Sequence, residues 1–330
     1  MRGWLTLSTA LVVAWIVPRI EARIRTQTQT QTPMRVERPF QSGIEVTSIT
    51  ATVTDAEGHL IAGLPREAFE VDEDGERQTI TQFTSERVPI GLGVLLDISD
   101  SMFGRRIEDA RAAVDRFLFQ LLDSSDEFFL VVFNHRPRTL TGWTRSQPEI
   151  QRALAALKPF GGTAIYDAIL DALPLVEHRS RARAALLVIS DGADTASNAS
   201  LRDVRMALLR NDAFVYAIAI DSPERQPINT RVNAQALREI TAETGGRTEL
   251  VRSSADLVEA TTSIAEELSC QYVLGYTSSH GADGQFHSIR VRAAARTDRS
   301  APGTPVAQGA QYRVRARSGY VATPLRTTPR

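Results

Sequence analysis

The sequence is poor in cysteine and in lysine. Cys270 is the only cysteine among 330 residues, which excludes a disulfide within the chain. Lysine occurs once, at Lys158, so arginine supplies nearly all of the 38 basic residues. These are spread along the chain together with 39 acidic residues and leave a formal net charge of -1. Because no basic stripe is present, we expect no nucleic-acid partner.

The motifs that mark several enzyme classes are also absent from the sequence. It has no P-loop, no His-Glu-x-x-His metalloprotease motif and no Gly-x-Ser-x-Gly nucleophile elbow. Its five histidines are scattered and show no recognisable partner spacing: His59, His135, His178, His280 and His287. These absences favour a binding protein over an enzyme.

An apolar stretch near the N-terminus is too short to span a membrane. It runs from Trp4 to Val17, whereas a spanning helix needs about 20 residues. Arg2 precedes it and Ala22 is the best last residue before a cleavage site, which is typical of an export signal. We therefore predict a signal peptide at residues 1–22 and a mature protein in the periplasm, the cell envelope or the extracellular space. An uncleaved signal would instead tether the protein to the membrane.

Polar and alternating segments surround the middle of the chain. The repeat TQTQTQTP within residues 23–41 cannot build a core and predicts a low-complexity tether. Residues 42–88 and 270–322 alternate apolar with polar side chains and predict β-rich segments with short antiparallel strands. These two segments either join into one β-sandwich around an inserted domain or remain separate. Residues 323–330 form a tail.

Residues 89–269 alternate buried strands with amphipathic helices. Continuous apolar runs predict strands at Ile90–Leu96, Phe128–Phe133, Ala184–Ser190 and Phe214–Ile220. Helical spacing predicts helices at 107–121, Glu149–Leu157, Ala164–Val176, Leu201–Leu209, Asn233–Thr244 and Ala255–Leu268. Strands that are apolar on both faces need helices on both sides. The predicted fold class is therefore α/β, with a doubly wound, Rossmann-like parallel sheet.

Polar residues gather at the ends of two of these strands and in one glycine-rich turn. The segment DISDS begins at Asp97, SDGADT begins at Ser190, and FGGT ends at Thr163. Each segment alone would be an ordinary capped helix start. In an open parallel sheet, however, ligands bind beyond the carboxyl ends of the strands, where these segments would meet. Their coincidence at that edge predicts a site.

The candidate ligands offer oxygen atoms only: Asp97, Ser99, Ser101, Thr163 and Asp191. Oxygen ligands suit a hard divalent cation such as Mg²⁺, and they do not suit zinc or copper. Two carboxylates would balance the charge of the ion, and three hydroxyls would fill most of its shell. One coordination position would remain for water or for a carboxylate from another molecule.

These residues and their spacing resemble the von Willebrand factor type A domain, over about residues 89–269. That family has a metal-ion-dependent adhesion site with an Asp-x-Ser-x-Ser motif, a distant Thr and a distant Asp. The motif matches DISDS from Asp97, and Thr163 and Asp191 match the other two positions. The resemblance implies Mg²⁺, or Mn²⁺ or Ca²⁺ in its place, and a partner that presents an Asp or Glu carboxylate. The flanks, with GLPREAFEVDEDGERQTI and QYVLGY, resemble bacterial type A-related proteins described from acidobacteria.

Two further aspartates lie close to the motif. The family usually has glycine between the two serines, whereas this chain has Asp100. Aspartate tolerates unusual backbone angles, so we expect the turn to form. The extra charge of Asp100 would either raise the metal affinity or repel an acidic ligand. Asp194 would either contact the metal through water or remain a solvated loop carboxylate.

The sequence therefore predicts an exported binding or adhesion protein that works through a metal and is not an enzyme. Its partner would be a protein or another macromolecule with an exposed carboxylate. One alternative is a Mg²⁺-dependent hydrolase of the phosphatase type, in which Asp97 accepts a phosphoryl group. Ser99 replaces the second carboxylate of that pattern, which disfavours it. The other alternative is a structural domain whose metal site is unused.

Overall fold

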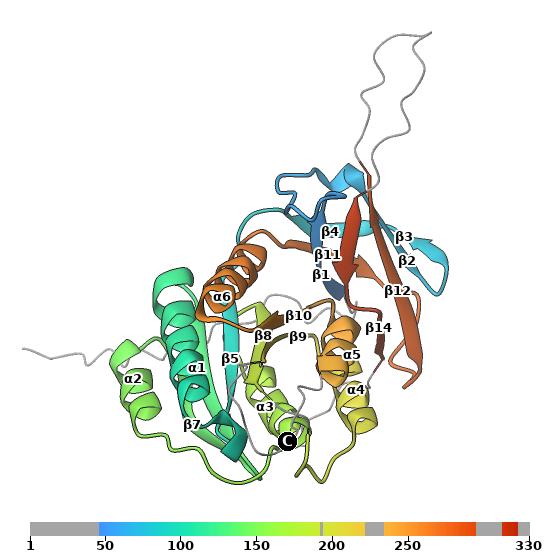
Figure 1. Ribbon diagram of the computed structural model, residues 1–330. Coiled ribbons are helices and arrows are strands. Elements are labelled where there is room, and N and C mark those ends of the chain that lie inside the picture. Colours follow the sequence, from blue (N-terminus) through green and yellow to red (C-terminus); the bar gives the residue numbers. More distant parts are fainter. Residues whose placement is uncertain (1–45, 192–193, 222–233, 295–311, 323–330) are drawn as a thin grey trace, which may run out of the picture. The chain divides into compact units, whose positions relative to one another are not determined.

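The computed structural model describes residues 46–191, 194–221, 234–294 and 312–322. The predicted signal peptide, tether and tail, at residues 1–22, 23–41 and 323–330, lie outside these ranges. Within the described ranges, no helix combines the length and the apolar character needed to cross a membrane. Figure 1 shows how the described helices and strands are arranged.

A six-stranded sheet forms the middle of the described chain, in the order β10-β9-β8-β5-β6-β7. Its central strands are the four predicted ones: β5 (Ile90–Asp97), β6 (Glu127–Phe133), β8 (Arg183–Ser190) and β9 (Phe214–Ile220). They run parallel, with β5 between β8 and β6. Strand β10 (Thr248–Val251) pairs parallel with β9 and extends this order. The predicted α/β class is confirmed.

One edge of this sheet departs from the predicted parallel arrangement. Strand β7 (Pro137–Thr144) pairs antiparallel with β6, and Phe133 and Pro137 are register partners. Only residues 134–136 connect the two strands, whereas a parallel neighbour would need a crossover of about a dozen residues. The short connection therefore forces a hairpin at this edge.

Six α-helices of the described chain cover the two faces of the sheet (Figure 1). They are α1 (Arg105–Arg116), α2 (Gln147–Ala155), α3 (Ile165–Glu177), α4 (Leu201–Leu209), α5 (Ala234–Thr244) and α6 (Ser254–Ser269). A π-helical turn, Phe117–Leu121, continues α1. Ser200 and Ser253 begin α4 and α6 with capping boxes, in which each hydroxyl accepts a backbone N–H of the first turn. Every predicted helix has a counterpart.

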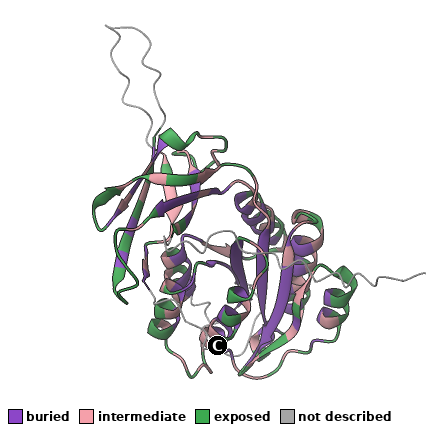
Figure 2. Cartoon of the chain, turned by 180° about the vertical axis from the view of Figure 1, so that it is seen from behind, coloured by how far each residue is buried: buried purple, intermediate pink, exposed green. Residues whose placement is uncertain are grey.

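The six-stranded sheet is buried on both faces, as its apolar strands predict (Figure 2). On β5, Leu92, Val94 and Leu96 lie in one hydrophobic cluster with residues of α1 and α6. Leu95 lies in a second cluster, with residues of α3, α4 and α5. Both faces are therefore occupied by helices, which leaves the carboxyl ends of the strands as the edge where polar side chains can gather.

The N-terminal and C-terminal flanks build two antiparallel sheets together. One has the order β13-β1-β11-β4 and the other β14-β12-β2-β3. The N-terminal strands are β1 (Val46–Thr54), β2 (Phe69–Glu73), β3 (Glu76–Gln78) and β4 (Ile80–Thr84). The C-terminal strands are β11 (Tyr272–Thr277), β12 (Phe286–Ala293), β13 (Arg313–Ala316) and β14 (Gly319–Val321). Each sheet thus takes strands from both flanks.

The two antiparallel sheets share one hydrophobic cluster. Ile49 and Leu274 come to it from one sheet, and Val71 and Ile289 come from the other. The sequence leaves two arrangements of the flanks open, joined or separate, and the structure has the joined one. The six-stranded sheet and its helices are inserted between β4 and β11, which are themselves paired.

A buried carboxylate joins the inserted part to the antiparallel strands. Glu267 of α6 accepts hydrogen bonds from the hydroxyl of Thr52 in β1 at 3.1 Å and from that of Tyr216 in β9 at 2.8 Å. Arg247 at 2.8 Å and Arg315 at 2.5 Å form ion pairs with its other oxygen. A buried charge is tolerated only when it is paired and hydrogen-bonded. This network therefore links α6 to β1, β9, β13 and the start of β10.

Candidate functional site

Strand β5 ends in a buried carboxylate, that of Asp97. The residue is 0% exposed. The backbone N–H of Ser99 donates to Asp97 Oδ1 at 2.8 Å, and the hydroxyl of Ser190 donates to Oδ2 at 2.5 Å. Ser190 ends the neighbouring strand β8, so the pairing of β5 with β8 positions this donor. Sequence reasoning did not include Ser190 among the site residues, although it directly precedes Asp191.

The two serines of the motif connect Asp97 to Asp191. Ser99 Oγ and Ser101 Oγ lie 2.9 Å apart. The hydroxyl of Ser101 donates to Asp191 Oδ1 at 2.6 Å, and Asp191 is buried directly after β8. The structure thus brings four of the five predicted ligands into one hydrogen-bonded cluster.

Thr163, the fifth predicted ligand, is linked to this cluster through the backbone. The N–H of Asp100 donates to the carbonyl of Gly161 at 2.9 Å, which ties the two loops together. Thr163 is buried, and its N–H donates to Thr195 Oγ1 at 3.0 Å. Gly161 has a φ of 79°, and a Cβ there would lie 2.8 Å from Nδ1 of His135. Glycine is therefore needed for this loop to approach the site.

A buried arginine completes the cluster and was not predicted. Arg106, in the first turn of α1, is 4% exposed and forms an ion pair with Asp191 Oδ2. The same guanidinium donates to the carbonyl of Ser101 at 3.1 Å. The sequence does contain a signal that Arg106 is buried. Arg106 lies four residues before Ala110 and eight before Val114, so helical spacing places it on the buried face of α1. An arginine at such a position indicates a buried anion beside it.

Burial changes the acidity of both aspartates. The pKa of Asp97 is raised to about 7, chiefly by burial and to a smaller extent by the nearby charge of Asp191, while the hydrogen bonds from Ser190 and Ser99 oppose the shift. Burial also raises the pKa of Asp191, while Ser101 and Arg106 oppose that shift. Both carboxylates are therefore costly to ionise in the metal-free site, and a bound cation would offset this cost.

The affinity of this cluster for Mg²⁺ is expected to rise with pH up to about 7. A metal binds the carboxylate and not the carboxylic acid, and the pKa of Asp97 is raised to about 7. Below that pH, the apparent affinity should fall by about tenfold per pH unit, because one proton competes with the ion. Calorimetric titrations with Mg²⁺ between about pH 5.5 and about pH 8.5 measure this slope. A constant affinity over that window would contradict the prediction.

The two neighbouring aspartates have separate roles. Asp100 is exposed and begins a 3₁₀ turn, Asp100–Met102, so the turn forms without glycine, as expected. Asp194 Oδ2 accepts the N–H of Tyr166 at 3.0 Å and the hydroxyl of Ser197 at 2.6 Å. Asp194 thereby caps the start of α3 and is not a freely solvated carboxylate.

The comparison with known families agrees with this geometry. Residues 92–193 match the family of the von Willebrand factor type A domain. The chain contains a von Willebrand factor type A domain. The match runs from β5 to beyond Asp191 and so includes all five of the oxygen ligands predicted from the sequence. No curated protein matches the chain.

Several solved structures are similar to this chain. The conserved hypothetical protein BatB from Bacteroides thetaiotaomicron is 23% identical over 55% of this chain and 97% of its own, with a TM-score of 0.46. A von Willebrand factor type A protein from Catenulispora acidiphila is 14% identical over 84% of this chain and 75% of its own, with a TM-score of 0.49. Proximal thread matrix protein 1 from the mussel byssus, with a zinc-occupied MIDAS motif, is 16% identical over 60% of this chain and 50% of its own, with a TM-score of 0.49.

Two exposed aromatic residues lie close to the DISDS motif, one in the sequence and one through a backbone hydrogen bond. Phe103 is 71% exposed and Phe160 is 53% exposed. The N–H of Phe160 donates to the carbonyl of Ile98 at 2.9 Å, which places this residue directly beside the DISDS loop. Its ring contacts that of His135, with the centroids 5.9 Å apart. Exposed aromatic residues around a polar centre are typical of protein-binding surfaces.

Proposed function

We propose that this protein is an exported binding protein that captures a macromolecular partner through a divalent cation. The observation that carries the proposal is the oxygen cluster at the ends of β5 and β8. Asp97, Ser99, Ser101 and Asp191 would hold Mg²⁺, or Mn²⁺ or Ca²⁺ in its place, and Thr163 would supply a fifth oxygen. Hard divalent cations prefer such oxygen ligands, and an ion held this way binds one further anion or water.

The charges around the cluster favour a partner that brings a carboxylate. Among the described residues, the ion pairs give Asp191 one cationic partner, Arg106. Asp191 Oδ2 faces Arg106 and Oδ1 faces Ser101, so the aspartate can keep its ion pair while Oδ1 binds a metal. With a divalent ion present, the two carboxylates and Arg106 leave one positive charge in the site. An Asp or Glu of the partner would neutralise it.

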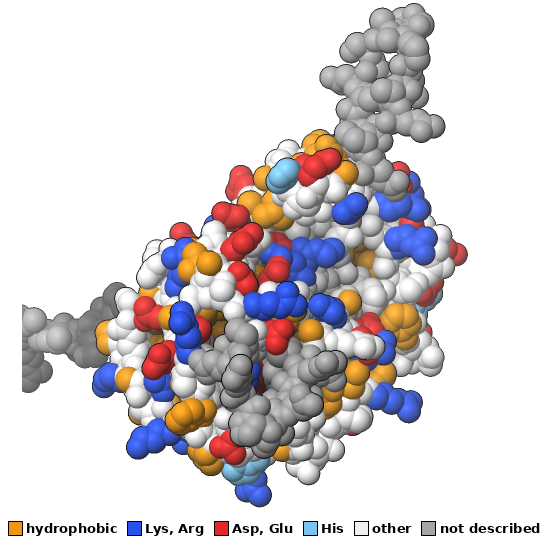
Figure 3. Space-filling view, viewed as in Figure 1, with side chains coloured by type: hydrophobic (Ala, Val, Ile, Leu, Met, Phe, Trp, Pro, Cys, Tyr) orange, Lys and Arg blue, Asp and Glu red, His pale blue; other side chains and the backbone are white. Residues whose placement is uncertain are grey.

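The surface around the site would add apolar contacts to this charge pairing. Phe103 follows the motif two residues after Ser101, Phe160 is hydrogen-bonded to Ile98 within the motif, and both side chains are exposed. Figure 3 shows acidic and basic side chains intermixed on the face drawn there. A surface of mixed charge steers an approaching partner only weakly. We expect the affinity to come from the metal and from the aromatic contacts.

Export is the second part of the proposal and rests on the N-terminal sequence. Arg2 precedes the apolar stretch from Trp4 to Val17, which is typical of a signal peptide. Cell fractionation and N-terminal sequencing test this part. We expect the protein in the cell envelope or outside the cell, cleaved near Ala22 or tethered to the membrane by an intact signal. Full-length protein in the soluble cytoplasmic fraction would contradict export.

A pull-down from cell-envelope extract tests the binding function. The protein is expected to retain its partner in Mg²⁺ and to release it in EDTA, and Asp97→Ala should retain none. Binding that persists unchanged in EDTA and in Asp97→Ala would show that the partner uses another surface. A phosphatase screen with Mg²⁺ tests the hydrolase alternative, for which we expect no activity that depends on Asp97.

Replacing Phe160 with serine is expected to weaken partner binding by about 30-fold without changing the Mg²⁺ affinity. The loss of an exposed aromatic anchor costs about 2 kcal/mol at an interface, and this side chain contributes no ligand atom. Calorimetry with the captured partner and with Mg²⁺ measures the two affinities separately. Phe286→Ser is the matched control, since Phe286 is 49% exposed but belongs to β12. Equal partner affinities of both variants would exclude Phe160 from the interface.

A further inference from the structure

We propose that a second metal site, for a transition-metal ion of the Zn²⁺ class, lies outside the type A domain. Its ligands would be Asp74, His280 and His287. Asp74 lies in the turn between β2 and β3, His280 lies between β11 and β12, and His287 lies in β12. The site does not depend on the function proposed for the type A domain.

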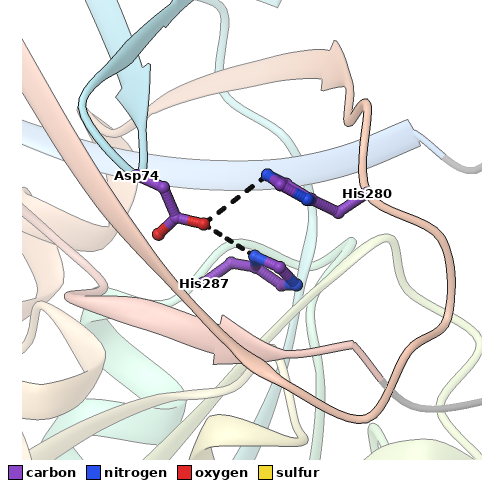
Figure 4. A group of neighbouring side chains, drawn as sticks. All are labelled: Asp74, His280 and His287. Atoms are coloured by element: carbon purple, nitrogen blue, oxygen red, sulfur yellow. Dashed lines mark hydrogen bonds and ion pairs between the residues drawn. The ribbon is translucent and has the colours of Figure 1, made fainter.

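The three side chains converge on one point, as Figure 4 shows. Asp74 Oδ2 lies 2.8 Å from His287 Nδ1 and 3.5 Å from His280 Nε2. All three ligand atoms lie within 4.8 Å of one another. In a tetrahedral zinc site with bonds of about 2.0–2.1 Å, neighbouring ligand atoms are roughly 3.3 Å apart. Small side-chain movements would therefore be enough to hold an ion.

A fourth side chain orients His287 toward this point. Asp283 Oδ1 lies 3.2 Å from Nε2 of His287, on the opposite edge of the ring from Nδ1. A carboxylate there accepts the Nε2–H and leaves the lone pair of Nδ1 for a metal, and metal-ligating histidines commonly have such a partner. His287 is 4% exposed, and its ring contacts those of His280 and Tyr320, with centroids 4.2 and 5.5 Å away. The nitrogen ligand is therefore held in a fixed direction.

The carboxylate of Asp74 is also held in place. The N–H of Ser288 donates to Asp74 Oδ1 at 2.8 Å, and the N–H of Asp74 donates to the carbonyl of Ser288 at 3.0 Å. Asp74 has a φ of 49°, a value that aspartate accepts more readily than most residues. With Oδ1 engaged by β12, Oδ2 remains directed at the histidines.

The ligand set selects the class of ion. Two imidazole nitrogens and one carboxylate suit Zn²⁺ and its neighbours, whereas Mg²⁺ prefers oxygen ligands alone. Three protein ligands leave one position of a tetrahedral shell for water or for a ligand from another molecule. The ion would link the β2–β3 turn to β12, and Asp74 and His287 are 213 residues apart in the chain. It would therefore stabilise the joined flanks.

Equilibrium dialysis of the full-length protein against Zn²⁺, followed by elemental analysis, tests the proposal. The wild-type protein is expected to bind one zinc ion that His280→Ala loses. Asp283→Asn should weaken binding by about 10–100-fold, as the loss of a carboxylate behind a ligating histidine does. Asp97→Asn should keep this ion, which separates it from any zinc bound in the type A domain. With Co²⁺ in place of zinc, the wild type should show the visible absorption of a tetrahedral site.

His59→Ala is the matched control for the loss of a histidine. His59 is exposed and pairs with Asp55 at 3.0 Å, but it has no second histidine in contact among the described residues. This variant should keep the zinc ion, and circular dichroism of each metal-free variant verifies its fold. Zinc binding by His280→Ala equal to that of the wild type would overturn the proposal. So would a wild-type protein that binds no zinc, or one whose zinc is lost entirely in Asp97→Asn.

Discussion

Replacing Asp97 with asparagine is expected to make the metal-free protein more stable and to abolish its response to Mg²⁺. The pKa of Asp97 is raised from 3.8 to about 7, so the native state holds a proton that the unfolded chain has already lost. The free energy of unfolding of the metal-free wild type therefore falls as the pH rises from about 4 through about 7. At pH 8 it is lower than at acid pH by an amount on the order of 4 kcal/mol. Asparagine does not ionise and avoids this loss. It also removes a charged ligand, so the metal should no longer bind.

Urea unfolding at pH 8, in EDTA and in saturating Mg²⁺, measures both effects. The wild type should gain about 2.7 kcal/mol at a Mg²⁺ concentration 100 times its dissociation constant, and Asp97→Asn should gain nothing. Asp100→Asn is the control, because it removes the same charge from an exposed position in the same loop. Its metal-free stability should stay within about 0.5 kcal/mol of the wild type. Equal Mg²⁺ responses of Asp97→Asn and the wild type would contradict the proposed metal site.

Replacing Arg106 with methionine is expected to destabilise the metal-free protein. Arg106 is buried beside Asp191, and removing one partner of a buried ion pair costs about 3–5 kcal/mol because the other charge loses its compensation. A bound Mg²⁺ would restore positive charge next to Asp191. The stabilisation by Mg²⁺ should therefore be larger in Arg106→Met than in the wild type.

The same unfolding experiments in EDTA and in Mg²⁺ measure this difference. Arg105→Met is the matched control, since Arg105 is the neighbouring residue but is exposed, with Asp109 3.7 Å away. An exposed ion pair of this kind contributes about 0–1 kcal/mol. A Mg²⁺ effect that is the same in Arg106→Met as in Arg105→Met would mean that the ion does not compensate Asp191.

Local patterns were enough to predict the four central strands and most helix ends, because burial on both faces and helical periodicity are visible in short windows. Strand β7 was missed because Arg138, Thr139 and Thr141 give it a polar pattern, and β10 was missed because it has only four residues. The flanks showed alternation but not their partners, since the pairing of β1 with β11 joins segments more than 200 residues apart. Pairing at that distance leaves no local signal.

The clustering of Asp97, Ser99, Ser101 and Asp191 was predictable because the carboxyl ends of parallel strands meet at one edge. Arg106 was missed because arginine is expected at the surface. The cluster of Asp74, His280 and His287 was missed for a different reason. Its residues follow no short ligand spacing, and only the pairing of β12 with β2 brings them together.

The insertion of the type A domain between two paired strands has a mechanical consequence. The chain enters the domain after Thr84 and leaves it before Val273, and these residues are register partners. Tension applied at the carboxyl ends of the central strands would therefore pull β4 and β11 in the same direction and would not separate them. With the chain held on the N-terminal side of β1, the load would pass to the pairing of β11 with β1. This pairing runs from the partners Val46 and Thr277 to the partners Ala51 and Tyr272. Because those hydrogen bonds lie perpendicular to the strands, they would resist together in shear instead of opening one after another.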